Sequence, residues 1–207
     1  MNKKTSTRLK CVNAAIKEFA LSGKDGAKME AIARRAGVNK AMLYYYFTSK
    51  DNLFIEALKI ILEKTYLKIM TEFDLLGGDS TDYIEQIKNL IDIQLKVFSE
   101  KAVYAKLFHI ALANEPEITK STLEALIAKD NSLKEFKDFL NEGARKGVFR
   151  KIDSNQTLIS IFGLTIVIFL AKPISEVLLG RNISNEKDFN QKRKDAIIDL
   201  FLNGILV

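Results

Sequence analysis

Residues 32–47 read IARRAGVNKAMLYYYF, a stretch that predicts two short helices joined by a tight turn. Gly37 should end the first helix, because glycine alone carries no steric penalty at the left-handed backbone position that a three-residue turn requires. Asn39 is a good cap for the second helix, since its side-chain oxygen can accept a backbone N–H that the helix leaves unpaired. The stretch therefore predicts a helical hairpin over about residues 28–47.

The second helix of this hairpin has two unlike sides. At about 100° per residue, Leu43, Tyr46 and Phe47 fall on one side, which suits packing against the preceding helices. The opposite side carries a cation, a small residue and two phenols, with a methionine at the border: Lys40, Ala41, Tyr44, Tyr45 and Met42. Lysine and tyrosine donate to phosphate oxygens, and a small apolar side chain can pack against a thymine methyl group, so this side suits a DNA major groove. The alternative is an ordinary helical hairpin with half-buried tyrosines.

The positive charge of the chain is concentrated around the hairpin. Residues 1–50 contain 11 Lys and Arg against three Asp and Glu, a net charge of +8, whereas the whole chain carries +6, so the other 157 residues carry −2. A basic segment joined to a nearly neutral remainder is typical of a phosphate-binding domain with a partner domain. Solvation alone explains the terminal Lys3 and Lys4, but it fits less well for the cations inside the hairpin.

Residues 5–65 resemble the tetracycline-repressor (TetR) family of transcriptional regulators. The resemblance rests on four successive motifs: an amphipathic first helix with Leu9, Val12, Ile16, Phe19 and Ala20, then Ile32-Ala33 through Gly37-Val38, then residues 43–47, then Ser49-Lys50-Asp51-Asn52-Leu53. It implies that the helix over residues 39–46 enters the major groove. It also implies that Lys50 contacts the DNA backbone at the start of the next helix.

The expected DNA-binding residues combine the outward face with what the resemblance implies. They are Lys28, Glu30, Asn39, Lys40, Ala41, Met42, Tyr44, Tyr45 and Lys50. Two of them depart from the family's pattern. Lys28 stands where many relatives have a serine or threonine cap, so the cap of the first hairpin helix should be weak. Glu30 would repel phosphate but could accept a hydrogen bond from cytosine N4.

The rest of the chain predicts further helices, because 47% of its residues are hydrophobic and long stretches with a 3.6-residue apolar period dominate. The expected ranges are 49–73 with Ser49 as its cap, 81–98, 102–113, 119–146 as one helix or two broken near Asn131, 154–171 and 187–205. The prediction is an all-α fold of about nine helices. A helix-turn-helix DNA-binding domain is expected over residues 1–50, and a larger helical ligand-binding and dimerisation domain over residues 51–207.

The last two predicted helices indicate a homodimer. The helix over residues 154–171 is apolar on nearly every side, and the final helix has an apolar stripe beside a charged face. Pairing both with their copies would close a four-helix bundle, and the alternative is a core within one chain that uses the same stripes. The expected dimer residues are Phe162, Ile166, Phe169, Ile197, Ile198, Phe201 and Leu202. A symmetric pair of recognition helices would read a palindrome with half-sites about 34 Å apart, or a multiple of that.

Similarity to the family also implies a pocket for a small, largely apolar effector in the larger domain. Ligand binding would shift the helix over residues 49–73, so that the recognition helices no longer match the groove spacing. The candidate lining residues are Tyr66, Met70, Phe73, Tyr104, Phe108, His109, Phe136 and Phe162. The alternative for each is ordinary core packing, and a lone imidazole such as His109 is usually a core residue.

Other classes of function find little support. One His, one Cys and no glycine-rich loop provide neither a nucleophile–base pair nor a metal or cofactor motif. The apolar run over residues 158–171 is shorter than the about 20 residues of a membrane helix, so a buried helix is expected. The basic start, residues 1–7, is not followed by the apolar core of a signal peptide, so a cytoplasmic protein is expected. The favoured function is a ligand-released repressor that binds a palindromic operator as a homodimer. The alternatives are a helical ligand-binding protein without DNA activity and an all-α enzyme with a buried carboxylate.

Overall fold

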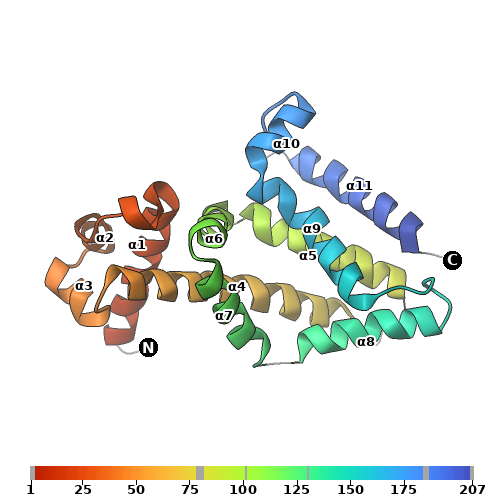
Figure 1. Ribbon diagram of the computed structural model, residues 1–207, viewed down its shortest axis with the longest axis horizontal. Coiled ribbons are helices and arrows are strands. Elements are labelled where there is room, and N and C mark those ends of the chain that lie inside the picture. Colours follow the sequence, from red (N-terminus) through yellow and green to blue (C-terminus); the bar gives the residue numbers. More distant parts are fainter. Residues whose placement is uncertain (1–2, 78–81, 101, 130, 184–186, 206–207) are drawn as a thin grey trace. The chain divides into compact units, whose positions relative to one another are not determined.

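The computed structural model describes residues 3–77, 82–100, 102–129, 131–183 and 187–205, and their side chains except at 3–4, 73–77 and 187–188. This part of the chain contains eleven α-helices (Figure 1), which confirms the all-α prediction. The count exceeds the expected nine for two reasons. The stretch 119–146 is divided between two helices, with Asn131 at the start of the second. A short helix over Lys172–Leu179 was not expected, and Pro173 lies in its first turn, where a helix tolerates proline.

The chain divides into two compact units, Met1–Lys64 with Ala102–Leu126 and Thr65–Lys101 with Ile127–Val207. The helices of the first unit are α1 (Lys3–Gly26), α2 (Met29–Ala36), α3 (Lys40–Tyr46), α6 (Ala102–Asn114) and nearly all of α7 (Pro116–Ile127). Those of the second are α5 (Tyr83–Glu100), α8 (Ser132–Arg145), α9 (Ser154–Leu170), α10 (Lys172–Leu179) and α11 (Lys187–Ile205). The long helix α4 (Lys50–Gly77) begins in the first unit and ends in the second.

The first unit is built around two buried aromatic rings. Phe19 of α1 and Phe54 of α4 meet edge to face, with ring centroids 5.1 Å apart. Ile32 of α2 and Leu43 of α3 are also fully buried, so both helices of the predicted hairpin are anchored by apolar side chains. Helix α1 packs against both α2 and α6. These contacts hold α2 and α3 in place against the other helices of the first unit.

The core of the second unit is a layer in which α5 packs against α9 and α11. Ile87, Ile91 and Ile161 are completely buried in it. A buried polar pair joins α9 to α5 in this layer, where the Thr165 hydroxyl donates to Gln94 Oε1 at 2.6 Å. Because a buried hydroxyl without a partner is costly, this bond favours a single register of α9 on α5.

No single helix in the described ranges is long and apolar enough to cross a membrane. Helices α9 and α10 pass that test only as a pair, and the pair is bent by 86°.

Candidate nucleic-acid interface

The hairpin of α2 and α3 has the geometry that its sequence predicts. Gly37 lies in the left-handed region, with φ 70° and ψ 33°, and ends α2. The next residue closes the turn, because the Val38 N–H donates to Ala33 O at 3.0 Å. Asn39 caps α3 by accepting from the Met42 N–H at 2.7 Å. The turn is therefore held by backbone and side-chain hydrogen bonds on both sides of Gly37.

The side chains of α3 divide between an inner and an outer face. Leu43 is fully buried, and Phe47, which follows the helix, is nearly so. On the outer face the exposed fractions are 42% for Tyr44 and 69% for Tyr45, and Lys40 and Ala41 are also exposed. This division agrees with the helical spacing in the sequence. The outer face of α3 thus presents one cation and two phenols to solvent. A helix that binds in a DNA major groove needs such exposed donors on one face.

Two of the expected DNA-binding residues contact each other. Lys40 Nζ forms an ion pair with Glu30 Oε1, and it also lies over the Tyr44 ring, 5.8 Å from the centroid. The hydrogen bond to Glu30 raises the pKa of Lys40, and the same bond lowers the pKa of Glu30. Because both groups are exposed, the pair is weak and a phosphate oxygen can replace the carboxylate. Glu30 thus competes with any other anion for Lys40.

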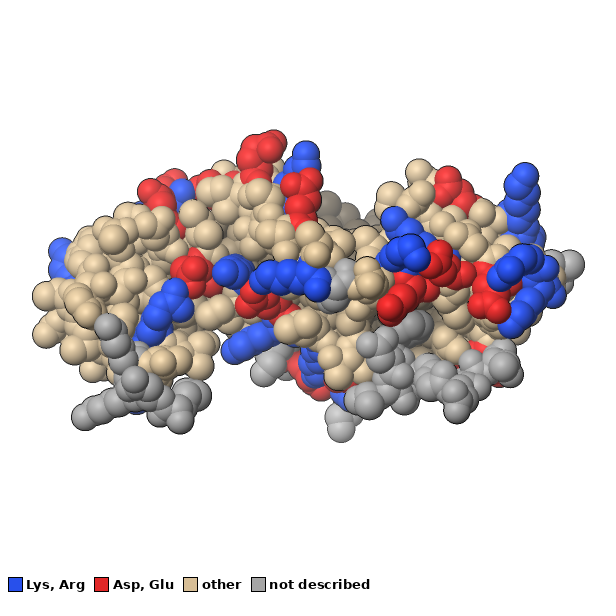
Figure 2. Space-filling view, turned by 90° about the horizontal axis from the view of Figure 1, so that it is seen from below, with Lys and Arg blue, Asp and Glu red and all other residues tan. Residues whose placement is uncertain are grey.

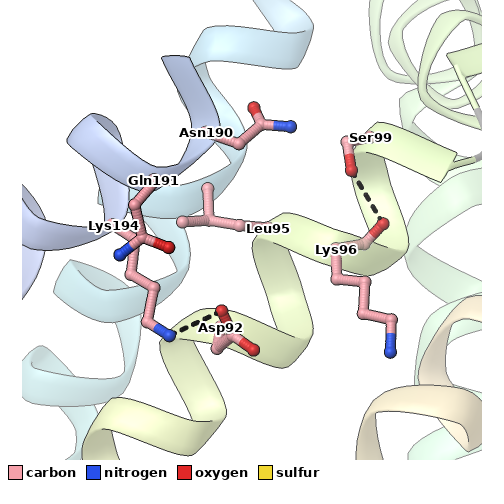
Figure 3. A pocket seen from close by; sticks show the side chains of 7 residues that line it. All are labelled: Asp92, Leu95, Lys96, Ser99, Asn190, Gln191 and Lys194. Carbon is pink, nitrogen blue, oxygen red and sulfur yellow. Dashed lines mark hydrogen bonds and ion pairs between the residues drawn. The ribbon is translucent and has the colours of Figure 1, made fainter. Parts of the chain in front are cut away.

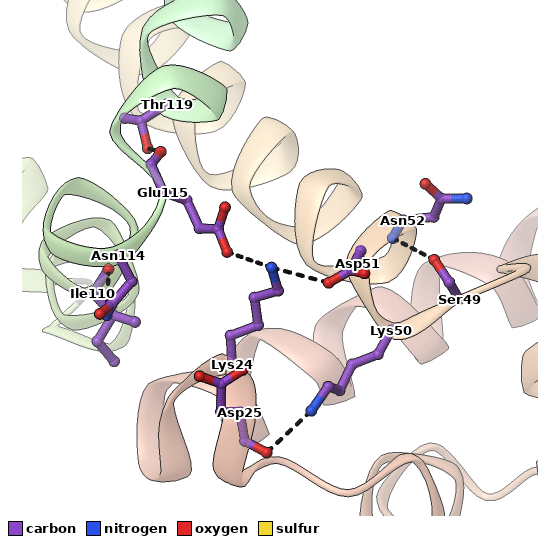
Figure 4. Close-up of polar contacts among 10 residues, drawn as sticks. All are labelled: Lys24, Asp25, Ser49, Lys50, Asp51, Asn52, Ile110, Asn114, Glu115 and Thr119. Atoms are coloured by element: carbon purple, nitrogen blue, oxygen red, sulfur yellow. Dashed lines mark hydrogen bonds and ion pairs between the residues drawn. The ribbon is translucent and has the colours of Figure 1, made fainter.

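The remaining basic residues of the expected set lie beside the hairpin. Lys28 precedes α2 in an extended conformation, and its side chain makes no capping hydrogen bond, as its type predicts. Lys50 Nζ, at the start of α4, donates to Asp25 O at 3.0 Å and so ties α4 to the end of α1 (Figure 4). Ser49 caps α4 by accepting from the Asn52 N–H at 3.0 Å, as expected. Both lysine side chains remain in contact with solvent, Lys28 more fully than Lys50.

One cluster in the first unit could not be found from the sequence. Lys24 Nζ, near the end of α1, lies 2.9 Å from Asp51 Oδ1 and also pairs with Glu115 Oε1, between α6 and α7 (Figure 4). The hydrogen bond to Glu115, followed by that to Asp51, raises the pKa of Lys24. Lys24 and Glu115 are 91 residues apart, and no spacing or motif connects them. The cluster joins α6 and α7 to the helices that carry the hairpin.

Charged side chains of both signs adjoin one another over the face seen in Figure 2. Some ion pairs of the chain join neighbouring turns of one helix, such as Lys134 with Asp138 at 3.0 Å in α8. Such exposed pairs contribute little to stability. Each such ion pair cancels one positive charge, so these pairs reduce the net positive charge of the surface on which they lie.

The expected ligand-binding residues are divided between the two units. Tyr104 and Phe108 are partly buried on α6 in the first unit, and His109 is exposed there, so it is not a core residue. The second unit holds Tyr66, Met70 and Phe162, together with Phe136, which is buried in the core. The side chain of Phe73 lies outside the described residues. The ligand role of these residues stays a prediction.

A groove of about 200 Å³ lies between α5 and α11 in the second unit (Figure 3). Its lining is mostly polar, and the Lys194–Asp92 ion pair, 2.8 Å long, lies in it. None of the expected ligand-binding residues lines this groove.

Most of the expected dimer residues are covered by the chain's own core. Ile166, Ile197, Phe201 and Leu202 are buried within the chain itself, and Phe169 and Ile198 are partly buried, so they offer little area to a partner. Phe162 alone of the expected set is exposed. The exposed apolar residues of α9 and α11 are Ile159, Phe162, Val167 and Leu200. A helix that is apolar all round does not indicate which side its own chain covers, and this explains the difference.

The fold and the hairpin together define a class of protein: a helix-turn-helix DNA-binding protein with a larger helical unit. The sequence matches two profiles of one family, "Bacterial regulatory proteins, tetR family" over residues 12–57 and "Tetracyclin repressor-like, C-terminal domain" over residues 84–200. The chain belongs to the TetR family of transcriptional regulators. This confirms the resemblance found in the sequence.

Individual relatives agree with this assignment. The transcriptional regulator RutR of Escherichia coli is 29% identical over 185 residues, which cover 87% of this chain and 82% of RutR. The transcriptional repressor NicS of Pseudomonas putida is 44% identical over 55 residues, 27% of this chain and 26% of NicS. The structure of FadR from Bacillus subtilis in complex with stearoyl-CoA has the same fold, with a TM-score of 0.72 and 17% identity over 95% of this chain and 98% of FadR. The named relatives are transcriptional regulators, not enzymes.

Proposed function

We propose that this protein is a repressor that binds a palindromic operator as a homodimer and is released by a small-molecule ligand. One observation carries the DNA-binding part of the proposal. Helix α3 is held by its buried Leu43, while its outer face offers Lys40, Tyr44 and Tyr45 to solvent. These side chains can donate to phosphates and contact base edges in a major groove. We place the site of action in the cytoplasm, because the partner is the operator DNA.

The homodimer is supported by the exposed apolar side of α9 and α11. Ile159 and Leu200 each expose more than three fifths of their surface, at 62% and 65%. Phe162 and Val167 of α9 are also exposed, and large apolar side chains that stay exposed together are typical of a surface that a partner covers. A second copy related by two-fold symmetry would cover it with the same residues. The pair would then present two recognition helices, and their half-sites would lie about 34 Å apart or a multiple of that.

Release by a ligand is supported by the continuity of α4. This helix carries Lys50, beside the hairpin, at its start, and Tyr66 and Met70 further along, in the second unit. A ligand that binds the second unit can therefore bias the position of the hairpin through one element. FadR, solved in complex with stearoyl-CoA, indicates that this fold can hold a ligand with a long apolar chain. The ligand must favour the DNA-free conformation by about 1–3 kcal/mol or more to release the operator.

The proposal is tested by mobility-shift titration on the DNA upstream of the protein's own gene. We expect a specific complex that weakens steeply with salt. Lys40→Ala and Tyr44→Ala should each weaken the specific complex by about tenfold or more, since a good base or phosphate contact contributes about 1–3 kcal/mol. Lys59→Ala is the matched control, because Lys59 is exposed on α4 in the same unit but away from the hairpin.

Two outcomes would count against the proposal. If Lys40→Ala and Tyr44→Ala both bind like the wild type and unfold at its temperature, the outer face of α3 does not read DNA. If the wild type gives no salt-sensitive complex on any duplex, a helical ligand-binding protein without DNA activity becomes the better assignment.

A further inference from the structure

An open groove of about 440 Å³ lies in the first unit between the exposed side of α1 and the end of α2. From α1 it is lined by Lys10, Asn13 and Lys17, whose spacing places them on one side of that helix. From the end of α2 and the following turn it is lined by Arg34, Arg35 and Gly37. The outward residues of α3 do not line it, so it is separate from the surface assigned above to base reading.

The groove is strongly basic. Four of its lining residues are cations and none is acidic. Arg35 alone of these cations has an acidic partner in the described part of the chain, since its Nη2 lies 3.0 Å from Glu18 Oε2 and its Nε lies 3.3 Å from the same atom. The Glu18 side chain is only 13% exposed, so it holds the more exposed Arg35 side chain from its buried side. Lys10, Lys17 and Arg34 remain without an acidic partner among the described residues.

We infer that this groove is a phosphate-binding site distinct from the recognition helix. Like charges that share one cleft repel each other in the free protein, and an anion relieves that repulsion. Glu18 occupies the Nε and Nη2 donors of Arg35 and thereby orients its guanidinium. The Nη1 donors of Arg35, the Arg34 guanidinium and the two lysines can donate to the oxygens of a phosphate group. The lining contains no aromatic side chain on which a base could stack, so the groove recognises phosphate rather than nucleobase.

The phosphate groups can come from two sources with the same chemistry. One is the backbone of duplex DNA beyond the stretch that α3 contacts, in which case the groove lengthens the electrostatic footprint of the regulator. The other is a free phosphate ester, in which case the groove is an anion site in the DNA-binding unit itself. The double variant K17Q/R34Q removes two of its charges, and K59Q/K64Q is the matched control because it removes two exposed charges from α4 in the same unit.

The DNA source is tested with a labelled random-sequence duplex of about 30 base pairs, titrated between about 50 and 200 mM salt. Each phosphate contact contributes about 0.9 to the slope of log K against log salt. If the groove contacts the backbone, K17Q/R34Q should lower that slope by about 1–2 relative to K59Q/K64Q. Because the duplex has a random sequence, the slope does not depend on recognition of the operator. Operator recognition is tested separately with Lys40→Ala and Tyr44→Ala.

The free-phosphate source is tested with inorganic tripolyphosphate in thermal unfolding. If the groove binds free phosphate groups, tripolyphosphate should raise the Tm of the wild type and of K59Q/K64Q, and K17Q/R34Q should lose that rise while keeping the wild-type salt slope. Without added anion, K17Q/R34Q should unfold at or above the wild-type temperature, because it removes like charges. The inference is overturned if K17Q/R34Q and K59Q/K64Q give the same salt slope and the same response to tripolyphosphate.

Discussion

Cys11, the single cysteine of the chain, is fully buried on α1, and burial raises the pKa of its thiol. Because the thiolate is the reactive form, the folded protein should not react with a thiol reagent at about pH 8. A raised pKa in the folded state means that this group supports folding below the unfolded value of 9.0, and that the support is lost as pH rises through the folded pKa.

Thiol labelling in increasing urea checks this prediction. Labelling should begin only in the unfolding transition, and the midpoint urea concentration should fall when the pH is raised above about 9. A Cys11→Ser variant is the blank for the reagent, but it buries a hydroxyl and should be less stable. Rapid labelling of the folded wild type at about pH 8 would show that Cys11 is not held in the core.

Residue-level features of the hairpin could be predicted from the sequence wherever the interaction is local. The turn at Gly37 and the cap at Asn39 depend on backbone conformation and on neighbours within three residues, and both were expected. The pairing of Lys24 with Glu115 was not expected, because it depends on how α6 packs against α1. The Lys40–Glu30 pair was also missed, although both residues had been assigned to the interface.

At the scale of single helices, α8 depends on a glycine for close packing. A Cβ added at Gly143 would lie 2.5 Å from Cε2 of Phe149, a fully buried ring. Gly143→Ala should therefore destabilise the protein by about 1–3 kcal/mol, since the ring or the helix must move. Gly163 is the matched control, because it also lies inside a helix and an added Cβ would meet nothing within 4 Å.

Urea unfolding followed by circular dichroism measures both substitutions. We expect Gly163→Ala to be neutral or to stabilise by up to about 1 kcal/mol, because alanine is the better helix former. Equal stability of the two alanine variants would contradict the close packing of Phe149 on α8.

Apolar periodicity predicted where most helices lie along the chain. It did not always predict which side of a helix is buried. In α3 one side is apolar, so the inner and outer faces could be assigned correctly. In α9 nearly every side is apolar, so periodicity could not separate the buried Ile166 from the exposed Ile159. Helix α10 was missed because Pro173 fits both the end of one helix and the first turn of the next.

At the scale of the whole molecule, the domain boundary expected at residue 50 came from charge and motif alone. The structure groups α6 and most of α7 with the hairpin, a feature of tertiary packing that no local pattern encodes. The boundary at residue 50 stays a prediction of where the DNA-binding function ends, and it is not the edge of a compact unit.

The oligomeric state is the next prediction at this scale. Phe162 and Leu200 lie on the exposed side of α9 and α11, with 42% and 65% of their surfaces exposed. Phe162→Glu with Leu200→Glu should convert a dimer to a monomer, because two-fold symmetry places each new charge in an apolar interface twice. Sedimentation analysis would measure the change, and Lys134→Glu in α8 is an exposed control. A double variant that stays dimeric would move the interface elsewhere.

The most direct test of sequence-specific reading by α3 is selection of bound duplexes from a random pool, with the wild type and Tyr44→Ala compared. We predict that the wild type enriches one palindrome whose half-sites lie about one helical turn or a multiple of it apart. Tyr44→Ala, with unchanged folding, should recover that palindrome weakly or with altered bases. Enrichment of the same palindrome to the same degree by both proteins, or of none by the wild type, would contradict the assignment of α3 as the recognition helix.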